Sequence, residues 1–222
     1  MLKGQKLVAD DGHEVMLFPL PYMKITQGEN GSYSHRGTYN IDFVGYGKSG
    51  RIYKAPLYAP CSCKCVRTID ANNKGRIFQS LDKVWTPKGL QYVNFMFFHD
   101  NKPIAKVGSK FKQGDLIGHT GTAGLSTGDH THFNCAKGKY TFWEKVPPDG
   151  HGQLKNSTHI YQICYINNTV KVNPYMYPWE TYKGKVKPEP EPEPWFKTKR
   201  SKFPWVLYAR MLRDKRLRRL QR

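Results

Sequence analysis

Two histidines at alternate positions are the residues of this chain with the clearest chemical meaning. They are His130 and His132, in the segment 128–133 (GDHTHF), which follows a turn rich in Gly, Ser and Thr. Side chains two positions apart on a strand point to the same face of the sheet, so both imidazoles are expected to project into one site. One of them can bind a metal ion while the other stays free for proton transfer.

A further imidazole and a carboxylate occur upstream, in the segment 34–42 (SHRGTYNID). Two histidines and one carboxylate, with the fourth position left to water, form a catalytic zinc set rather than a closed structural one. A His-x-His pair alone is weak evidence, because such pairs also occur in proteins that bind no metal. The combination nevertheless predicts a zinc hydrolase.

Four segments together resemble a known family. Residues 114–133 (GDLIGHTGTAGLSTGDHTHF) resemble the Gly-x-x-Ile-Gly, Gly-rich turn and His-x-His-Phe series of the lysostaphin-type zinc endopeptidases of bacterial cell walls. Residues 55–60 (APLYAP), 95–99 (FMFFH) and 172–174 (VNP) resemble further segments of that family. The match covers most of residues 16–178 in the family's order. It implies a small, folded-over antiparallel sheet.

The resemblance also implies roles for five residues. His35, Asp42 and His132 would ligate Zn²⁺, with water in the open position, and the ion would lower the pKa of that water to about 7. His99 and His130 would stand beside the water without binding the metal, for proton transfer or support of the oxyanion. Which of these two is the general base stays open. The implied activity is endopeptidase cleavage of peptidoglycan stems or cross-bridges, with the bond unspecified.

One spacing departs from most of the family. Six residues separate His35 from Asp42, whereas most members have three. The longer spacing is similar to that of peptidoglycan-cutting tail-knob proteins of small phages that infect Gram-positive bacteria. The two ligands can still meet if residues 37–40 form a turn. This similarity implies a virion tail protein that acts on the host wall during infection. A lysis endolysin and a catalytically inactive tail-structural or wall-binding module are the alternatives. All five site positions are filled, which favours the enzyme.

The pattern of apolar residues predicts a mainly β fold with antiparallel hairpins. Runs rich in Val, Ile, Tyr, Phe and Thr, such as 51–58, 61–69 and 91–98, are broken by Gly, Asn and Pro, and no long helical periodicity interrupts them. Residues 137–168 exceed what the family core needs. This insertion is expected either to line one wall of the substrate groove or to brace the sheet, and the two interpretations have equal support.

The cysteines and the remaining histidines are expected to be structural. Cys61, Cys63 and Cys65 alternate along one strand, so they share a face and are poorly placed to pair with one another. Together with Cys135 they are interpreted as small buried hydrophobes. Free thiols indicate synthesis in a reducing cytoplasm. A packed or solvated imidazole is expected at the other histidines, which are His13, His119, His151 and His159.

Composition predicts three parts, namely a catalytic domain (1–182), a Pro/Glu linker (183–194) and a basic tail (195–222). The linker alternates Pro with Glu and is expected to be extended. The tail holds eleven Lys or Arg and one acid, Asp214, and so carries +10 of the chain's +19. A basic helix and a solvated tail are equally supported.

The tail is the part of the chain expected to find a partner. Other phage tail proteins, anionic wall polymers or a membrane surface would suit its charge. Nucleic acid ranks low because no base-reading motif is present. The first residues, 1–7 (MLKGQKL), hold no apolar core of signal-peptide length, and no segment looks long enough to cross a membrane. Synthesis in the host cytoplasm and release within the virion are therefore expected.

Overall fold

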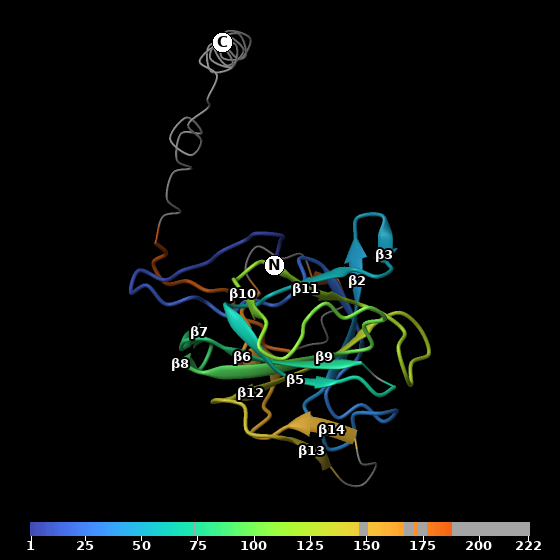
Figure 1. The fold of residues 1–222 in the computed structure, drawn as a ribbon. Helices are drawn as coiled ribbons and strands as arrows, with labels where there is room; N and C mark the ends of the chain where they lie inside the picture. Colours follow the sequence, from blue (N-terminus) through green and yellow to red (C-terminus); the bar gives the residue numbers. More distant parts are fainter. Residues whose placement is uncertain (73, 147–150, 167–170, 173–176, 188–222) are drawn as a thin grey trace, which may run out of the picture. The chain divides into compact units, whose positions relative to one another are not determined.

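The computed structural model describes residues 1–187 except 73, 147–150, 167–170 and 173–176. This part is mainly β, and its strands are almost all antiparallel, which confirms the predicted fold class (Figure 1). Its one helical element is the 3-10 turn η1 (Ile160–Gln162). Among these residues no helix is long and apolar enough to cross a membrane. The predicted tail and the linker residues from 188 onward lie outside the described residues.

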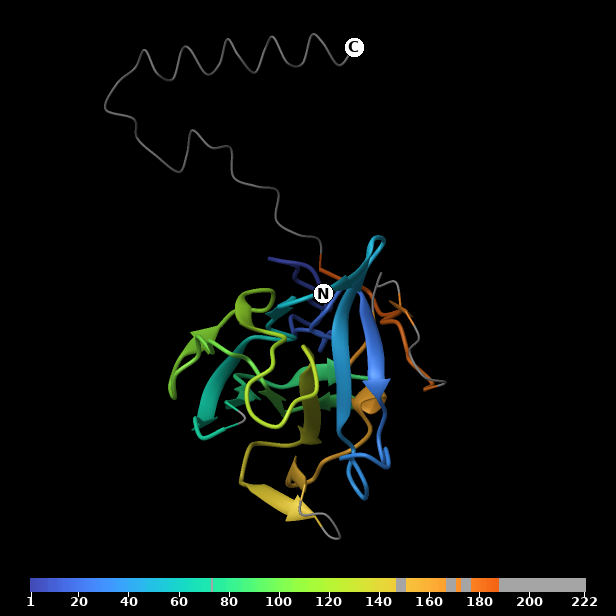
Figure 2. The same ribbon diagram turned by 90° about the vertical axis from the view of Figure 1, so that its right-hand side faces the viewer.

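One large sheet organises the domain, and its strand order differs from the chain order (Figures 1 and 2). In spatial order its described strands are β10 (Lys110–Phe111), β5 (Cys63–Ile69), β6 (Gly75–Ser80), β9 (Val93–Phe98), β12 (Thr131–Lys137), β2 (Ile41–Gly47), β1 (Met23–Gln27) and β15 (Lys171–Val172), with β3 (Gly50–Ile52) paired to β2. Only the pairing of β1 with β15 is parallel. Strand β12 therefore lies between β9 and β2, although these three strands are far apart in the chain.

Three small two-stranded sheets accompany the large one in the described part of the chain. They pair β4 (Pro56–Tyr58) with β11 (Leu116–His119), β7 (Val84–Thr86) with β8 (Gly89–Gln91), and β13 (Trp143–Val146) with β14 (His151–Leu154). The β13–β14 hairpin belongs to the predicted insertion.

Side chains along the central strands point alternately to the two faces of the sheet. One face packs into the core, and the other, called the site face, carries Asp42 and His132. The rings of Phe43, Phe97 and Phe133 are buried together on one side of the sheet, and the rings of Phe97 and Phe133 stack with centroids 4.8 Å apart. Residues next to them in sequence, Asp42 and His132, must then point to the other side. Burial of these phenylalanines fixes the register, because a shift by one residue would exchange the two faces.

The opposite side of the sheet is covered in part by the hairpin. Phe98 and Ala136 pack there with Leu154 of β14, and Trp143 of β13 lies against this cluster. Asn134, also on this side, accepts a hydrogen bond from the Leu154 backbone N–H at 3.0 Å. The insertion therefore braces the sheet, and its relation to the groove is described below.

One of the predicted apolar runs, 51–58, contains parts of two strands, because β3 ends at Ile52 and β4 begins at Pro56. Between them Lys54 has φ = 51°, a left-handed conformation that ends strand pairing. The other two runs contain strands β5 and β9, each of which begins two residues later than its run.

The five cysteines are buried and free, as expected. Burial raises the pKa of the Cys61, Cys63 and Cys135 thiols well above the ordinary value. A thiol held in its neutral form packs as a small apolar side chain and reacts poorly. The interpretation of these residues as core hydrophobes is therefore confirmed.

The last described segment returns to the N-terminal residues that precede β1. The backbone N–H of Lys187 donates to the carbonyl of Val8 at 2.8 Å, and that of Asp10 donates to the carbonyl of Lys185 at 3.1 Å. Tyr182 packs edge-on against Tyr165, with ring centroids 5.4 Å apart. The division into domain, linker and tail stays a prediction, but the chain is bound to the domain as far as Lys187.

Candidate metal centre

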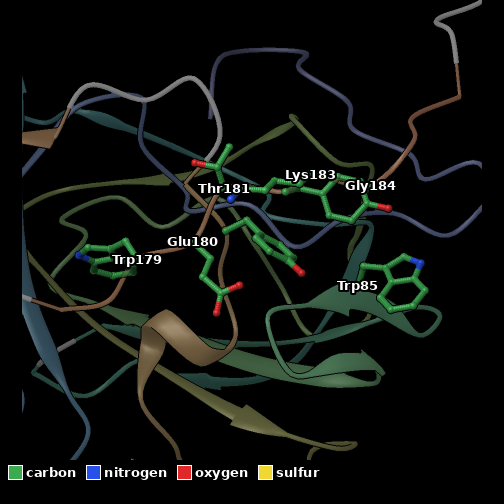
Figure 3. A pocket seen from close by; sticks show the side chains of 8 residues that line it. Trp85, Trp179, Glu180, Thr181, Lys183 and Gly184 are labelled. Carbon is green, nitrogen blue, oxygen red and sulfur yellow. The ribbon is translucent and has the colours of Figure 1, made fainter.

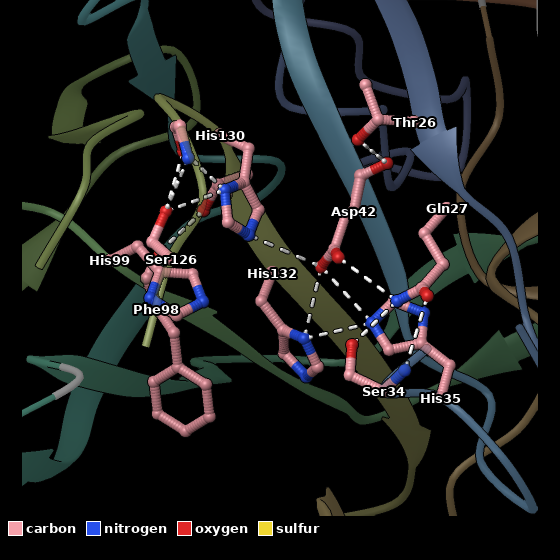
Figure 4. Close-up of polar contacts among 12 residues, drawn as sticks. Thr26, Gln27, Ser34, His35, Asp42, Phe98, His99, Ser126, His130 and His132 are labelled. Carbon is pink, nitrogen blue, oxygen red and sulfur yellow. Dashed lines mark hydrogen bonds and ion pairs between the residues drawn. The ribbon is translucent and has the colours of Figure 1, made fainter. Parts of the chain in front are cut away.

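Three side chains from separate elements meet on the site face of the sheet (Figure 4). Nε2 of His35 lies 3.2 Å from Oδ1 of Asp42 and 3.2 Å from Nδ1 of His132, and the last two atoms are also 3.2 Å apart. The described residues contain no other group of three or more His, Cys, Asp or Glu donors this close together. The predicted ligand set is thus one compact triangle.

Strand register positions two of the three side chains. His132 of β12 is the direct partner of Asp42 of β2, so their side chains are neighbours on one face. His35 comes from the loop between β1 and β2. The expected turn in this loop is present, since the Thr38 N–H donates to the His35 carbonyl at 2.9 Å and Gly37 has φ = 74°. Because of this turn, His35 lies next to Asp42 in space although six residues separate them in the chain.

Hydrogen bonding leaves lone pairs at the centre of the triangle. Nδ1 of His35 lies 3.0 Å from the carbonyl oxygen of Gly28, which can only accept, so Nδ1 carries the proton and Nε2 is an acceptor. Oδ1 of Asp42 is buried and has no hydrogen-bond partner. Buried hydrogen-bond acceptors that point at one another with too few protons to share destabilise the folded protein, unless a cation lies between them.

The triangle also has suitable dimensions for a tetrahedral ion. Two ligand atoms at tetrahedral positions lie about 3.3 Å apart when each is about 2.0–2.1 Å from zinc. The three observed separations of 3.2 Å agree with that value. A carbonyl that holds the second ring nitrogen of a ligating histidine is typical of metal sites. The residues therefore fit a zinc ion, with a fourth position left open.

His130 and His99 lie beside this triangle, with ring centroids 4.5 Å apart. Nδ1 of His130 lies 2.8 Å from the carbonyl oxygen of Gly128, and Nδ1 of His99 lies 2.7 Å from that of Ala123. Each carbonyl fixes the proton on Nδ1 and leaves the Nε2 lone pair free. Nε2 of His130 is 3.8 Å from Oδ1 of Asp42, outside the triangle's own spacing.

Known proteins similar to this chain include a phage protein and several peptidases. Over 171 residues the chain is 37% identical to Morphogenesis protein 1 of Bacillus phage B103. That match covers 77% of this chain and 45% of the phage protein, so the chain spans less than half of its relative's length. No model of a protein family matches the chain.

Solved structures with a similar arrangement include the catalytic domain of lysostaphin from Staphylococcus simulans. The two chains are 23% identical, the match covers 54% of this chain and 82% of that chain, and the TM-score is 0.38. Another is the catalytic domain of the prophage-encoded protein EnpA from Enterococcus faecalis, with 19% identity, 54% and 87% coverage, and a TM-score of 0.39. The chain resembles lysostaphin-type peptidases. This likeness is partial, so the roles of individual residues rest on the geometry of this chain.

Burial and neighbouring charges set the protonation of the residues of this centre. Burial lowers the pKa of His132 to about 4, although Asp42 acts in the opposite direction. Burial also lowers the pKa of His99 below its ordinary value. Burial raises the pKa of Asp42, but the adjacent imidazoles of His132 and His35 outweigh it and hold that pKa well below the ordinary value. Neutral imidazoles beside an ionised carboxylate are the forms that bind a cation.

Gln27 is a further residue of this centre that was not predicted from the sequence. Its side-chain amide donates to Oδ2 of Asp42 at 3.2 Å and to Oγ of Ser34 at 2.7 Å. No motif marks a glutamine at the end of a strand, so only the pairing of β1 with β2 reveals it. Asp129, between the turn and His130, was also missed. It is buried and accepts hydrogen bonds from Thr120 Oγ1 at 2.6 Å and from the Lys54 N–H at 3.0 Å.

The backbone at His99 is held in a rarely adopted conformation. His99 has φ = 78°, in the left-handed region that non-glycine residues seldom enter. Its carbonyl accepts the Ala123 N–H at 3.0 Å, while its imidazole faces the carbonyl of the same residue. The loop 121–124 therefore holds His99 by both backbone and side chain.

Gly121 is expected to be essential to this arrangement. A Cβ atom at Gly121 would overlap the carbonyl oxygen of His99 and lie 2.6 Å from Oδ1 of Asn101. We expect Gly121→Ala to lower the free energy of unfolding by about 1–3 kcal/mol, as measured by denaturant titration. Gly128→Ala is the matched control, because its Cβ would meet nothing nearer than Arg51 Nη2 at 3.7 Å. Equal stability of the two variants would contradict this assignment.

Asp42 and His132 of the triangle line a groove of about 990 Å³, and His35 is buried next to them. Trp143, Lys145 and Gly152 of the β13–β14 hairpin line it together with the histidines and the turn 125–130. The hairpin therefore braces the sheet and also forms part of the wall of this groove. Tyr33 and Leu125, which also line the groove, are the most exposed large apolar side chains of the described residues.

A second pocket, of about 610 Å³, lies between β7 and the segment 179–184 (Figure 3). Its described lining includes Trp85, Tyr165 and Tyr182, and its one carboxylate belongs to Glu180. No histidine or cysteine is part of that lining. This pocket therefore lacks the donor set of the groove.

Three other histidines have polar partners away from the centre. Nδ1 of His159 lies 2.5 Å from Oε2 of Glu29, and Nδ1 of His13 lies 3.3 Å from Oδ1 of Asp11. Nδ1 of His119 lies 4.0 Å from Oδ2 of Asp100. A structural role fits each of them, as expected.

Proposed function

We propose that this chain is a zinc-dependent endopeptidase that cleaves peptide stems or cross-bridges of bacterial peptidoglycan. The observation that carries the proposal is the triangle of His35, Asp42 and His132, with His99 and His130 beside it. The groove that Asp42, His132, His99 and His130 line has a volume of about 990 Å³, and we propose that it binds the peptide substrate. When bound, zinc would supply Lewis-acid polarisation of the scissile carbonyl and activation of a water molecule at neutral pH.

The two flanking histidines handle the protons in this proposal. Because Nδ1 of each ring is held by a backbone carbonyl, Nε2 is the atom that can take a proton from the attacking water. The same atom, once protonated, can donate to the leaving amine or stabilise the oxyanion. His99 and His130 share these tasks, and the geometry assigns neither task to one ring alone.

The biological setting that we propose is the virion tail, where the enzyme would open the host wall during infection. The 37% identity to a phage morphogenesis protein supports this setting. A lysis endolysin would use the same centre at a different stage. A catalytically inactive tail or wall-binding module is the alternative from another class, and the complete set of five site residues speaks against it.

Digestion of purified Gram-positive cell walls, followed by mass spectrometry of the released fragments, tests the activity. We expect new peptide ends within stems or cross-bridges, and the fragment masses identify the bond. The Asp42→Ala protein serves as the control. Intact walls after incubation with zinc-loaded protein would favour the inactive module.

We further propose that residues 195–222 attach the enzyme to a virion protein or to anionic wall polymers. Since the chain is bound to the domain as far as Lys187, a truncation after that residue is the suitable variant. We expect it to stay folded, to bind zinc and to cleave soluble peptides, but to sediment less with purified walls or assemble less into virions. Added salt should weaken wall binding by the full-length protein.

The matched control for the truncation keeps the tail and replaces its Lys and Arg residues by Gln. Loss of attachment in both variants would assign the effect to charge. Normal attachment of the truncated protein to walls and virions would contradict the role of the tail.

A further inference from the structure

Gln27 contacts both elements that bring the proposed ligands together. Its Nε2 donates to Oδ2 of Asp42 at 3.2 Å, and the same nitrogen donates to Oγ of Ser34 at 2.7 Å. Its Oε1 accepts the backbone N–H of Ser34 at 3.3 Å. Ser34 precedes His35, so a single amide joins the Asp42 carboxylate to the loop that carries His35 (Figure 4).

The orientation of this amide is determined by its partners. A carboxylate can only accept and a backbone N–H can only donate. Nε2 must therefore face Asp42, and Oε1 must face the N–H of Ser34. The reversed amide would place two acceptors together at Asp42 and two donors together at Ser34, and it is excluded.

An irregularity in β1 brings Gln27 to this position. Ile25 of β1 pairs with Phe43 of β2. Asp42, the residue before Phe43, then pairs with Gln27 rather than with Thr26. A bulge of this kind inserts one residue and redirects the side chains that follow. It leaves Thr26 bound to the backbone of Asp42, with Oγ1 3.3 Å from the carbonyl oxygen, while Gln27 takes the carboxylate.

We propose that Gln27 is a positioning residue that makes Asp42 a one-oxygen ligand and sets the metal affinity of the centre. The amide engages Oδ2, which leaves Oδ1 as the oxygen facing His35 and His132. Without it the carboxylate is free to rotate and to offer both oxygens, and Ser34, next to His35, loses its hydrogen bonds to the Gln27 amide. The inference rests on the proposed zinc site.

The test compares zinc affinity in Gln27→Met and the unmodified protein. Methionine has a similar length but neither donates to Asp42 nor accepts from the Ser34 backbone. We expect the zinc dissociation constant, measured by competition with a chelator, to rise about 10- to 100-fold, the usual effect of removing a partner that orients a ligand. Thr26→Val is the matched control, because it removes a bond to the Asp42 backbone but not to the carboxylate. Its dissociation constant should stay within about twofold of the unmodified value.

Cobalt substitution gives a second readout that a purely structural role would not change. A four-coordinate Co²⁺ centre absorbs visible light more strongly than a five-coordinate one. If Asp42 becomes a two-oxygen ligand in Gln27→Met, the visible absorption should weaken, whereas Thr26→Val should keep the original spectrum. Ser34→Ala removes one anchor of the amide and should show a smaller loss of zinc affinity. It replaces Gln27→Met in the comparison if the latter does not fold.

The outcomes separate this inference from the proposed function. Unchanged zinc affinity and cobalt spectrum in the Gln27 variant, or in Ser34→Ala when it stands in, would overturn the positioning role. Equal weakening in Thr26→Val would overturn it as well, because the effect would then belong to the strand. If the unmodified protein retains no zinc, the metal site itself is wrong and the inference falls with it.

Discussion

Replacement of His132 by alanine is expected to abolish zinc retention and wall hydrolysis together. His132 supplies one of three donor atoms that lie 3.2 Å apart, and the loss leaves His35 and Asp42 as a two-ligand site. Two protein ligands are fewer than the three of catalytic zinc centres. The zinc content after dialysis, determined by elemental analysis, and the release of peptides from walls are the measurements.

His119→Ala is the matched control for this variant. His119 lies on β11 outside the triangle, and its nearest charged partner is Asp100, with Nδ1 and Oδ2 4.0 Å apart. It should therefore keep both zinc and activity. Full zinc occupancy in His132→Ala would reject the assignment of the ligands.

Replacement of His99 or His130 by alanine is expected to separate metal binding from catalysis. Neither ring contributes an atom to the triangle, so both variants should retain zinc after dialysis. Their hydrolysis of walls should fall about a hundredfold or more, since proton transfer and oxyanion support each contribute about that much. The rate of peptide release at equal zinc content is the measurement.

Two results would each correct the roles of the flanking pair. A metal-loaded variant with full activity would remove that histidine from the proposed mechanism. A variant without zinc would identify its histidine as a ligand. Loss of zinc is the more informative outcome for His130, because its Nε2 is only 3.8 Å from Oδ1 of Asp42.

Several features of the fold and the centre could be predicted from local sequence pattern. The alternation of His130 and His132 indicated a shared face, because strand geometry has a period of two residues. The burial of Cys61, Cys63 and Cys65 followed from the same alternation and from the absence of a disulfide or zinc spacing. The mainly β fold followed from short apolar runs separated by turn residues. Each of these depends on neighbours in the chain.

The sequence by itself therefore determined which residue types are present and which share a face. Only the tertiary structure decided which strands lie side by side, and so made Asp42 the partner of both His132 and Gln27. Register between distant strands depends on the packing of whole faces and on bulges, neither of which has a local signature. The carbonyls of Gly28, Ala123 and Gly128 likewise fix the imidazole protons only after the loops have folded. Long-range packing thus turns five separate residues into a centre suited to a metal ion.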